Sequence, residues 1–173
     1  MPAVVRPAAP SDVAAMHGLI LELAEYENGL HEVVASEEDL FRALFGGTAF
    51  SDTPANTPSG TPGLYAFVID AAEGGLAGMA IWMLNYSTWE GQYGVYLEDL
   101  YVREAHRGKG YGRALMSSLA KVCRDNGYTR FQWWVLDWNS PAIEVYRRLG
   151  AVAMDEWTVY RLTGDPLREL GAR

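Results

Sequence analysis

Residues 97–115 read LEDLYVREAHRGKGYGRAL, and this order predicts a strand, then a glycine-rich turn, then the start of a helix. Glycine lets the backbone approach a ligand closely, and the free N–H groups at a helix N-terminus favour an anion. The turn holds three glycines and three basic residues: Gly108, Gly110, Gly112, Arg107, Lys109 and Arg113. The stretch therefore predicts a phosphate-binding loop.

The spacing excludes two common phosphate loops. A Walker loop needs Ser or Thr after its lysine, but Lys109 is followed by Gly110. A dinucleotide fingerprint needs a third glycine where Leu115 stands, three residues after Gly112. The remaining pattern, Arg107-x-x-Gly110-x-Gly112, resembles the acetyl-CoA pyrophosphate loop of the GCN5-related N-acetyltransferase (GNAT) superfamily. The alternative is a glycine-rich connection that only starts a helix.

Length and charge limit the classes of protein. A chain of 173 residues suits one domain over residues 1–173. The formal net charge of −8 argues against a nucleic-acid partner and suits a cationic small substrate. The sequence has neither an apolar run of transmembrane length nor the features of a signal peptide, so we expect no membrane partner.

Cysteine and histidine usage adds two expectations. The single Cys123 cannot form an internal disulfide, which favours a reducing, cytoplasmic location. The three histidines are scattered and show no metal-ligand spacing, so we expect no metal.

Periodicity and turn signals predict an α/β fold with the order β-α-α-β-β-β-α-β-α-β-β, one mixed sheet and helices on both of its faces. Residues 46–63 are rich in Gly, Pro, Thr and Ser and predict a flexible surface loop. The expected strands cover residues 3–6, 64–70, 76–86, 94–103, 131–136, 151–154 and 158–162. The expected helices cover residues 12–27, 36–44, 110–126 and 139–150.

Side chains along the strand at 94–103 should alternate between its two faces. The first face then holds Val95, Leu97, Asp99 and Tyr101. The second face holds Tyr96, Glu98, Leu100 and Val102. On this pattern the two adjacent carboxylates point to opposite sides of the sheet.

Further segments extend the resemblance over nearly the whole chain. They are LAEYE at 23–27, YSTW at 86–89, YLEDLYV at 96–102, VLDWN at 135–139 and VYRRLG at 145–150. Together they resemble the spermidine/spermine N-acetyltransferase branch. That branch typically has Asp-Pro-Trp where this chain has Ser87-Thr88-Trp89, as the thialysine-type relatives do. A diamine, thialysine or another amino-acid-like amine is therefore favoured over spermine.

The resemblance implies two catalytic residues. Glu98 accepts the proton of the amine, directly or through water, and Tyr146 donates a proton to the departing thiolate. Asp99 is a second carboxylate that either binds the amine or supports the site. The alternatives are solvated acids at a strand edge and a core tyrosine at helical spacing.

The resemblance also implies the residues that contact acetyl-CoA. A backbone N–H near Leu100 meets the oxyanion, and Asn139 either contacts CoA or only caps a helix. The complete set is Leu100, Val102, Arg107, Gly108, Lys109, Gly110, Tyr111, Gly112, Arg113 and Asn139. No metal ligand is expected.

Tyr26, Glu27, Trp89 and Asp99 are the candidates on the substrate side. Glu27 would hold a distal ammonium, and Trp89 would line an alkyl chain or make a cation–π contact. The alternatives are a solvated acid at a helix end and a tryptophan in a turn.

The resulting hypothesis is an acetyl-CoA-dependent N-acetyltransferase of small primary amines that transfers the acetyl group directly in a ternary complex. Cys123 lies away from the expected site, so no acetyl-cysteine intermediate is expected. The resemblance implies a homodimer. Two alternatives stay open: acetylation of a protein or peptide by the same fold, and a non-catalytic module that binds acyl-CoA.

Overall fold

The computed structural model describes residues 3–46, 57 and 61–172. Contacts divide the chain into two compact units, Met1–Trp134 and Val135–Arg173. Most of the predicted surface loop at 46–63 lies outside the described residues. A single domain over residues 1–173 stays a prediction.

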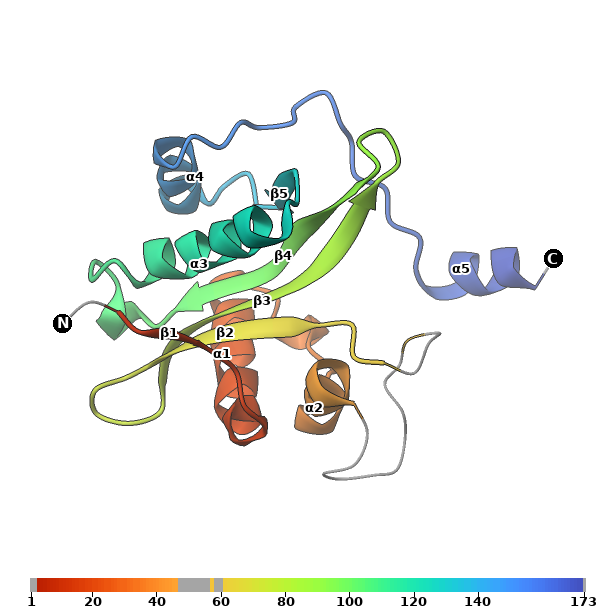
Figure 1. Ribbon diagram of the computed structural model, residues 1–173. Coiled ribbons are helices and arrows are strands. Elements are labelled where there is room, and N and C mark those ends of the chain that lie inside the picture. Colours follow the sequence, from red (N-terminus) through yellow and green to blue (C-terminus); the bar gives the residue numbers. More distant parts are fainter. Residues whose placement is uncertain (1–2, 47–56, 58–60, 173) are drawn as a thin grey trace. The chain divides into compact units, whose positions relative to one another are not determined.

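The first unit is built on a five-stranded sheet in the order β1-β2-β3-β4-β5 (Figure 1). Neighbouring strands from β1 to β4 are antiparallel, whereas β4 and β5 are parallel. The strands are β1 (Val5–Pro7), β2 (Tyr65–Asp70), β3 (Leu76–Ser87), β4 (Gln92–Val102) and β5 (Arg130–Trp133). The helices are α1 (Val13–Tyr26), α2 (Glu37–Phe45) and α3 (Tyr111–Asn126). Short 3-10 helices cover Pro10–Asp12, Leu30–Glu32 and Glu104–His106.

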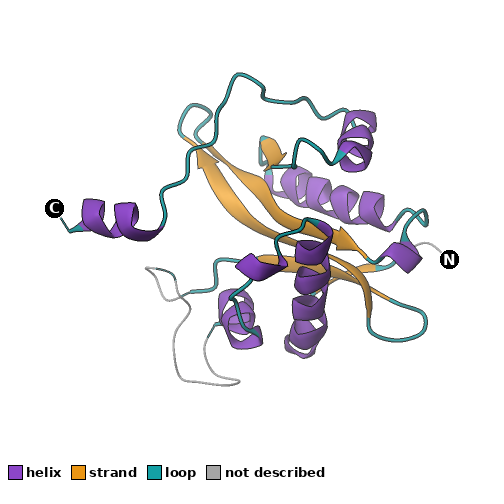
Figure 2. Ribbon diagram, turned by 180° about the vertical axis from the view of Figure 1, so that it is seen from behind, coloured by secondary structure: helices purple, strands orange, loops and turns teal. Residues whose placement is uncertain are grey.

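Helices cover both faces of this sheet. Figures 1 and 2 show α1 and α2 on one face and α3 on the other. On the first face, Met16 and Leu19 of α1 pack with Met79 and Ile81 of β3 in the core cluster. On the second face, α3 buries its own apolar side chains, including Leu119. The predicted class, an α/β fold with one mixed sheet between helices, is confirmed.

Local signals account for the helix ends. Ser36 precedes α2, where its hydroxyl accepts from the Asp39 N–H at 3.2 Å and the Asp39 carboxylate accepts from the Ser36 N–H at 2.9 Å. This reciprocal pair is the predicted capping box. At the C-terminal end of α3, Gly127 takes a left-handed φ of +69° and ends the helix.

A β-bulge in β4 overturns the predicted alternation of its side chains. Leu97 pairs with Trp82, but Asp99 pairs with the very next residue of β3, Ile81, so Glu98 is an extra residue. Paired residues of antiparallel strands share a face, and one inserted residue shifts the alternation by one.

Consequently Asp99 and Tyr101 face α1 together with Ile81, while Val95 and Leu97 face α3. The prediction that all four β4 residues share one face is wrong. Tyr101 accordingly belongs to the core cluster of the α1 face. The prediction that Glu98 and Asp99 point to opposite faces is wrong for the same reason. Leu97 faces α3, so the next side chain, Glu98, faces α1, and Asp99 faces α1 as well.

The second unit contains α4 (Ser140–Arg148) and α5 (Gly164–Gly171). The two predicted strands at 151–154 and 158–162 are not formed. A strand needs a partner that accepts its backbone hydrogen bonds, and short apolar runs do not supply one. The helix α5 was not predicted, although Pro166 in its first turn is a typical helix-start residue.

Candidate active site

The loop between β4 and α3 has the geometry of an anion site. Gly108 and Gly110 take left-handed φ values of +74° and +82°, which glycine adopts without strain. Gly110 immediately precedes α3, and no side chain caps this helix. The first N–H groups of α3, a helix of 16 residues, are thus directed at the loop with the positive end of the helix dipole.

The three glycines serve different needs. A Cβ at Gly108 or Gly110 would meet nothing within 4 Å, so the left-handed backbone alone calls for glycine there. At Gly112 a Cβ would lie 3.9 Å from Leu100 Cδ2, an ordinary contact. The predicted motif allows glycine or alanine at that position, and the structure has room for the methyl group.

Two of the three basic side chains beside the loop are held by protein groups. The Arg107 Nε donates to the Val102 carbonyl at 3.1 Å, and its guanidinium carbon lies 5.1 Å from the centre of the Tyr26 ring. Lys109 Nζ lies 3.4 Å from His106 Nδ1. Arg113 is exposed. Arg107 is thus directed toward α1 and β4.

A buried histidine connects the loop to the β2–β3 turn. His106 Nε2 lies 3.0 Å from a Glu73 carboxylate oxygen, and its ring stacks near Tyr111 with centroids 6.1 Å apart. Neither His106 nor Glu73 is predicted as a site residue from the sequence. No spacing motif relates them, because they meet only when the β2–β3 turn folds against the loop.

Three carboxylates gather on the α1 side of β4. Glu98 in the bulge is exposed, Asp99 is half-buried, and Glu27 directly follows α1. Burial, together with repulsion from Glu98 and Glu27, raises the pKa of Asp99 to about 6. Partial desolvation also raises the pKa of Glu27. The negative end of the α1 dipole adds to this acidic region, which favours a bound cation.

One edge of β4 opens at the bulge. The pairing of β4 with β5 runs from Gly94 with Arg130 to Leu97 with Trp133. From Glu98 onward, β3 is the only described strand that pairs with β4. The half-buried Leu100 and the buried Val102 lie in this part of β4. Its backbone groups on the open edge are therefore placed to bind an extended ligand.

Trp89 is not brought to the carboxylates. It stands in the turn between β3 and β4 with 92% of its surface exposed. Gln92 and Glu98 are six positions apart on β4, which is about 20 Å at 3.3 Å per position. Ser87, the last residue of β3, accepts from the Glu90 N–H at 3.2 Å, so it stabilises the turn.

The second unit carries the two other predicted site residues. Asn139 is buried and its side chain accepts from the Ala142 N–H at 3.4 Å, so it caps α4. Tyr146 lies on α4 and is half-buried. The capping role of Asn139 is confirmed, whereas its contact with CoA and the proton-donor role of Tyr146 stay predictions.

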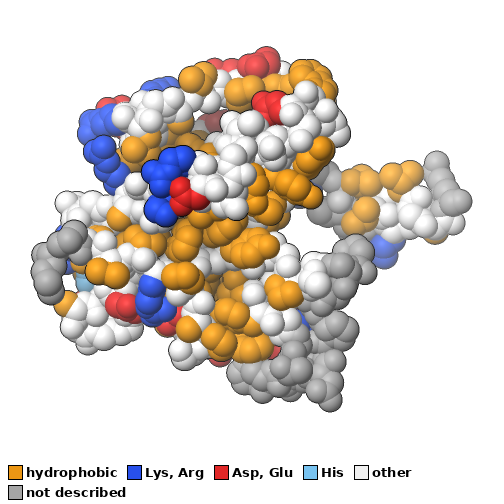
Figure 3. Space-filling view, in the orientation of Figure 1, with side chains coloured by type: hydrophobic (Ala, Val, Ile, Leu, Met, Phe, Trp, Pro, Cys, Tyr) orange, Lys and Arg blue, Asp and Glu red, His pale blue; other side chains and the backbone are white. Residues whose placement is uncertain are grey.

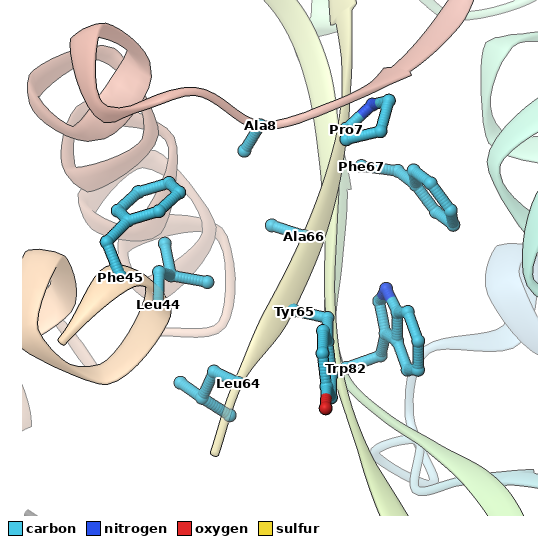
Figure 4. Close-up of a pocket in the computed structure, with 9 residues that line it drawn as sticks. All are labelled: Pro7, Ala8, Leu44, Phe45, Leu64, Tyr65, Ala66, Phe67 and Trp82. Carbon is cyan, nitrogen blue, oxygen red and sulfur yellow. The ribbon is translucent and has the colours of Figure 1, made fainter. Parts of the chain in front are cut away.

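The first unit also holds an apolar cavity. It has a volume of about 250 Å³ and lies beside β2, where Trp82 stacks on Tyr65 with ring centres 4.5 Å apart (Figure 4). Figure 3 shows apolar side chains gathered over this part of the sheet. The lining residues are Pro7, Ala8, Leu44, Phe45, Leu64, Tyr65, Ala66, Phe67 and Trp82. This lining lacks charged groups, so the cavity is no site for a phosphate or an ammonium.

The described residues hold neither a metal-binding cluster nor a membrane-spanning helix. Residues 3–46, 57 and 61–172 contain no group of three or more His, Cys, Asp or Glu side chains that could hold a metal ion. None of the helices in the same ranges has the length and apolar character required to cross a membrane.

Comparison with known proteins agrees with the geometry of the loop. A sequence model of the Acetyltransferase (GNAT) family matches residues 30–151. The chain is 36% identical to thialysine N-epsilon-acetyltransferase of Mus musculus, over 98% of this chain and 97% of that protein. It is 32% identical to an L-ornithine N5-acetyltransferase of Arabidopsis thaliana, over 96% and 86% of the two chains.

Solved structures show the same fold. An integron cassette protein from the mobile metagenome of V. cholerae is similar with a TM-score of 0.76 and 25% identity, over 100% of this chain and 99% of that one. An aminoglycoside acetyltransferase from an uncultured soil metagenomic sample, solved with sisomicin, has a TM-score of 0.71 at 15% identity, over 94% and 97% of the chains.

The fold and the anion loop are those of an acyl-transferring enzyme. The chain belongs to the GNAT acetyltransferase family.

Proposed function

We propose that this protein is an acetyl-CoA-dependent N-acetyltransferase of small primary amines, acting by direct transfer in a ternary complex. The observation that carries the proposal is the bulge at Glu98. It sets Glu98 and Asp99 on the α1 side of a strand that leads directly into the anion loop, so a carboxylate group and a phosphate site share one continuous segment.

The anion loop fits the phosphates of CoA. The N–H groups at the start of α3 and the left-handed Gly108 and Gly110 form a concave set of donors. The open edge of β4 from Glu98 to Val102 offers backbone groups to the amides of the pantetheine arm, with the N–H near Leu100 as oxyanion donor. Bound acetyl-CoA would supply an activated acetyl group and a thiolate leaving group.

The acidic side fits an amine. An alkylammonium must lose a proton before it attacks, and the exposed carboxylate of Glu98 is the proposed acceptor of that proton, directly or through water. Asp99 and Glu27 provide negative charge that binds the cation before transfer. Tyr146 is the proposed donor of the proton that the departing thiolate takes up.

The substrate proposal is an amino-acid-like amine or a diamine. The two curated relatives described above carry thialysine and ornithine in their names. Both substrates are small molecules with an alkylamine side chain. Glu27 beside Asp99 would hold a second ammonium in such a molecule.

The test is release of free thiol from acetyl-CoA with purified protein. The panel contains thialysine, ornithine, lysine, putrescine and spermidine, together with peptides that have free N-termini or internal lysine. Turnover of small amines above peptides supports the proposal. Turnover of peptides alone supports a protein acetyltransferase, and tight acetyl-CoA binding without thiol release from any amine supports a non-catalytic acyl-CoA-binding module.

Assembly and location form a separate part of the proposal. We propose a homodimer on the resemblance to the diamine acetyltransferase branch, and a cytoplasmic location because the single Cys123 is free and cannot form an internal disulfide. Light scattering of the purified chain measures its molar mass. A mass equal to one chain of 19.1 kDa would contradict the dimer.

A further inference from the structure

Two arginines in the β4–α3 connection contact successive turns of α1. Arg103 lies 2.8 Å from a Glu22 carboxylate oxygen through Nη2, and its Nε donates to the same oxygen at 2.9 Å. Arg107 places its guanidinium carbon 5.1 Å from the centre of the Tyr26 ring. Glu22 and Tyr26 are four residues apart on α1 and therefore lie on the same side of the helix, one turn apart.

Arg107 is oriented by three contacts, all on the α1 and β4 side of the loop. Its guanidinium carbon lies over the Tyr26 ring and also over the Tyr101 ring, whose centre is 5.7 Å away. Its Nε donates to the Val102 carbonyl at 3.1 Å. A planar guanidinium can stack on a ring and donate in its own plane at once, which an ammonium cannot do.

The residue that Arg107 contacts ends α1. Tyr26 is the last residue of the helix, Glu27 follows it, and Asn28 takes a left-handed φ of +60°. The Gly29 N–H then donates to the Ala24 carbonyl at 2.8 Å and closes the turn. The position of Tyr26 therefore sets where the Glu27 carboxylate lies.

We propose that Arg107 is a positioning residue: by holding Tyr26 it places Glu27 beside Asp99, and it couples the phosphate loop to the amine-binding carboxylates. Arg107 directly precedes Gly108 in the loop, so a shift of the loop backbone when an anion binds reaches Tyr26 through one side chain. The charge of Glu27 contributes to the raised pKa of Asp99, which agrees with this placement. The inference rests on the proposed function.

A double-mutant cycle tests the coupling, with KM for the amine measured at saturating acetyl-CoA. Arg107→Lys and Tyr26→Leu should each raise this KM by at most about threefold, the effect expected for loss of the Glu27 charge itself. The double variant should also show about threefold and not about ninefold, because both changes remove the same contact. Tyr26→Leu should leave kcat and the Kd for acetyl-CoA within about twofold, whereas Tyr26→Phe, which keeps the ring, should lie closer to the wild type.

Hydrogen exchange gives a second readout that does not need turnover. The amides of residues 27–29 should exchange faster in Arg107→Lys and in Tyr26→Leu. Arg124→Lys is the matched control, because Arg124 pairs with its neighbour Asp125 on the outer side of α3. It should leave both KM and exchange unchanged.

Two results would overturn the inference. One is a double variant whose effects on KM multiply, which makes the two residues independent. The other is unchanged exchange at residues 27–29 in Arg107→Lys. If the wild type acetylates no amine, the proposed function fails, and the exchange measurement still decides whether Arg107 holds the end of α1.

Discussion

The two helix ends that flank the site have opposite electrical character. The N-terminus of α3 presents free N–H groups behind Gly108 and Gly110, and it attracts an anion. The C-terminus of α1 ends beside Glu27, Glu98 and Asp99, and it attracts a cation. The same backbone dipole acts at both ends, so the direction of each helix, together with a few charged side chains, determines which end favours a phosphate and which end favours an ammonium.

The largest effect is expected for Gly110→Val, which should weaken anion binding at the N-terminus of α3. A β-branched residue at a φ of +82° strains the backbone, and its side chain occupies the space that a phosphate needs. The affinity for acetyl-CoA should fall about 1000-fold, because charge-assisted hydrogen bonds of about 1.5–3 kcal/mol each are lost. Isothermal titration measures the loss.

Gly127→Val is the matched control for that change. Gly127 has a φ of +69° at the other end of α3, and a Cβ there also meets nothing within 4 Å. This variant should lose comparable thermal stability and keep its affinity for acetyl-CoA. Micromolar binding by Gly110→Val would remove the loop from its assigned role.

Glu98→Gln tests the acidic end. Loss of the proton acceptor should lower kcat about 100-fold and leave acetyl-CoA binding within about twofold, so the two ends separate in one variant. Steady-state rates of thiol release with thialysine provide the measurement. Glu156→Gln, at an exposed carboxylate in the second unit, should have no effect, and an unchanged kcat in Glu98→Gln would exclude Glu98 as the base.

Tyr146→Phe tests the second proton transfer. The expected loss in kcat is about tenfold, because a thiolate with a pKa near 8.5 leaves readily even without a proton donor. The Kd for acetyl-CoA should stay within about twofold. Tyr160→Phe, at a fully exposed tyrosine of the same unit, serves as the control, and equal kcat values for the two variants would count against Tyr146 as a proton donor.

Glu27→Gln tests whether the carboxylates at the end of α1 bind a second ammonium of the substrate. A partly exposed ion pair contributes about 0.2–1 kcal/mol, so the KM for ornithine or a diamine should rise about threefold. A monoamine of the same length should show no change, since it has no second ammonium. Glu25→Gln removes the same charge two residues earlier, in the last turn of α1, and an equal rise in that variant would mean that Glu27 acts only through net charge.

Asp99→Asn should produce the smallest effect, an increase in stability that depends on pH. Burial and like charges raise the pKa of Asp99 to about 6, above its value in the unfolded chain. The folded state therefore holds a disfavoured charge above pH 6 and takes up a proton as the pH falls toward 4.

The variant should consequently melt about 2–4 °C above the wild type at pH 7.5. The difference should shrink at pH 4.5, where the wild-type side chain is largely protonated. Thermal melts followed by circular dichroism at the two pH values measure it. A variant that melts below the wild type at pH 7.5 would show that the charged form of Asp99 is stabilised by the fold.

The features that depend on a few neighbouring residues could be predicted from the sequence. The capping box at Ser36, the glycine stop at Gly127 and the cap at Asn139 each depend on hydrogen bonds within one turn. The periodicity of the core helices was also sufficient to place α1, α2 and α3, because tertiary packing buries the same stripe that the sequence displays.

The errors came from properties that no local pattern carries. The faces of Asp99 and Tyr101 were misassigned because the bulge depends on the pairing of β4 with β3. The contacts of His106 with Glu73 and of Arg107 with Tyr26 join segments that are distant in the sequence. The two strands expected after α4 were wrong because a strand is defined by its partner.

The inserted Glu98 makes β4 a strand of two phases. Before Glu98 the odd-numbered side chains Val95 and Leu97 face α3, whereas after it the odd-numbered Asp99 and Tyr101 face α1. Deleting Glu98 would make Leu97 and Asp99 consecutive opposite the consecutive Trp82 and Ile81, so β4 would alternate regularly with Asp99 and Tyr101 still facing α1. The bulge therefore adds one carboxylate beside Asp99 on the α1 side, an arrangement of neighbouring side chains that a regular strand does not allow.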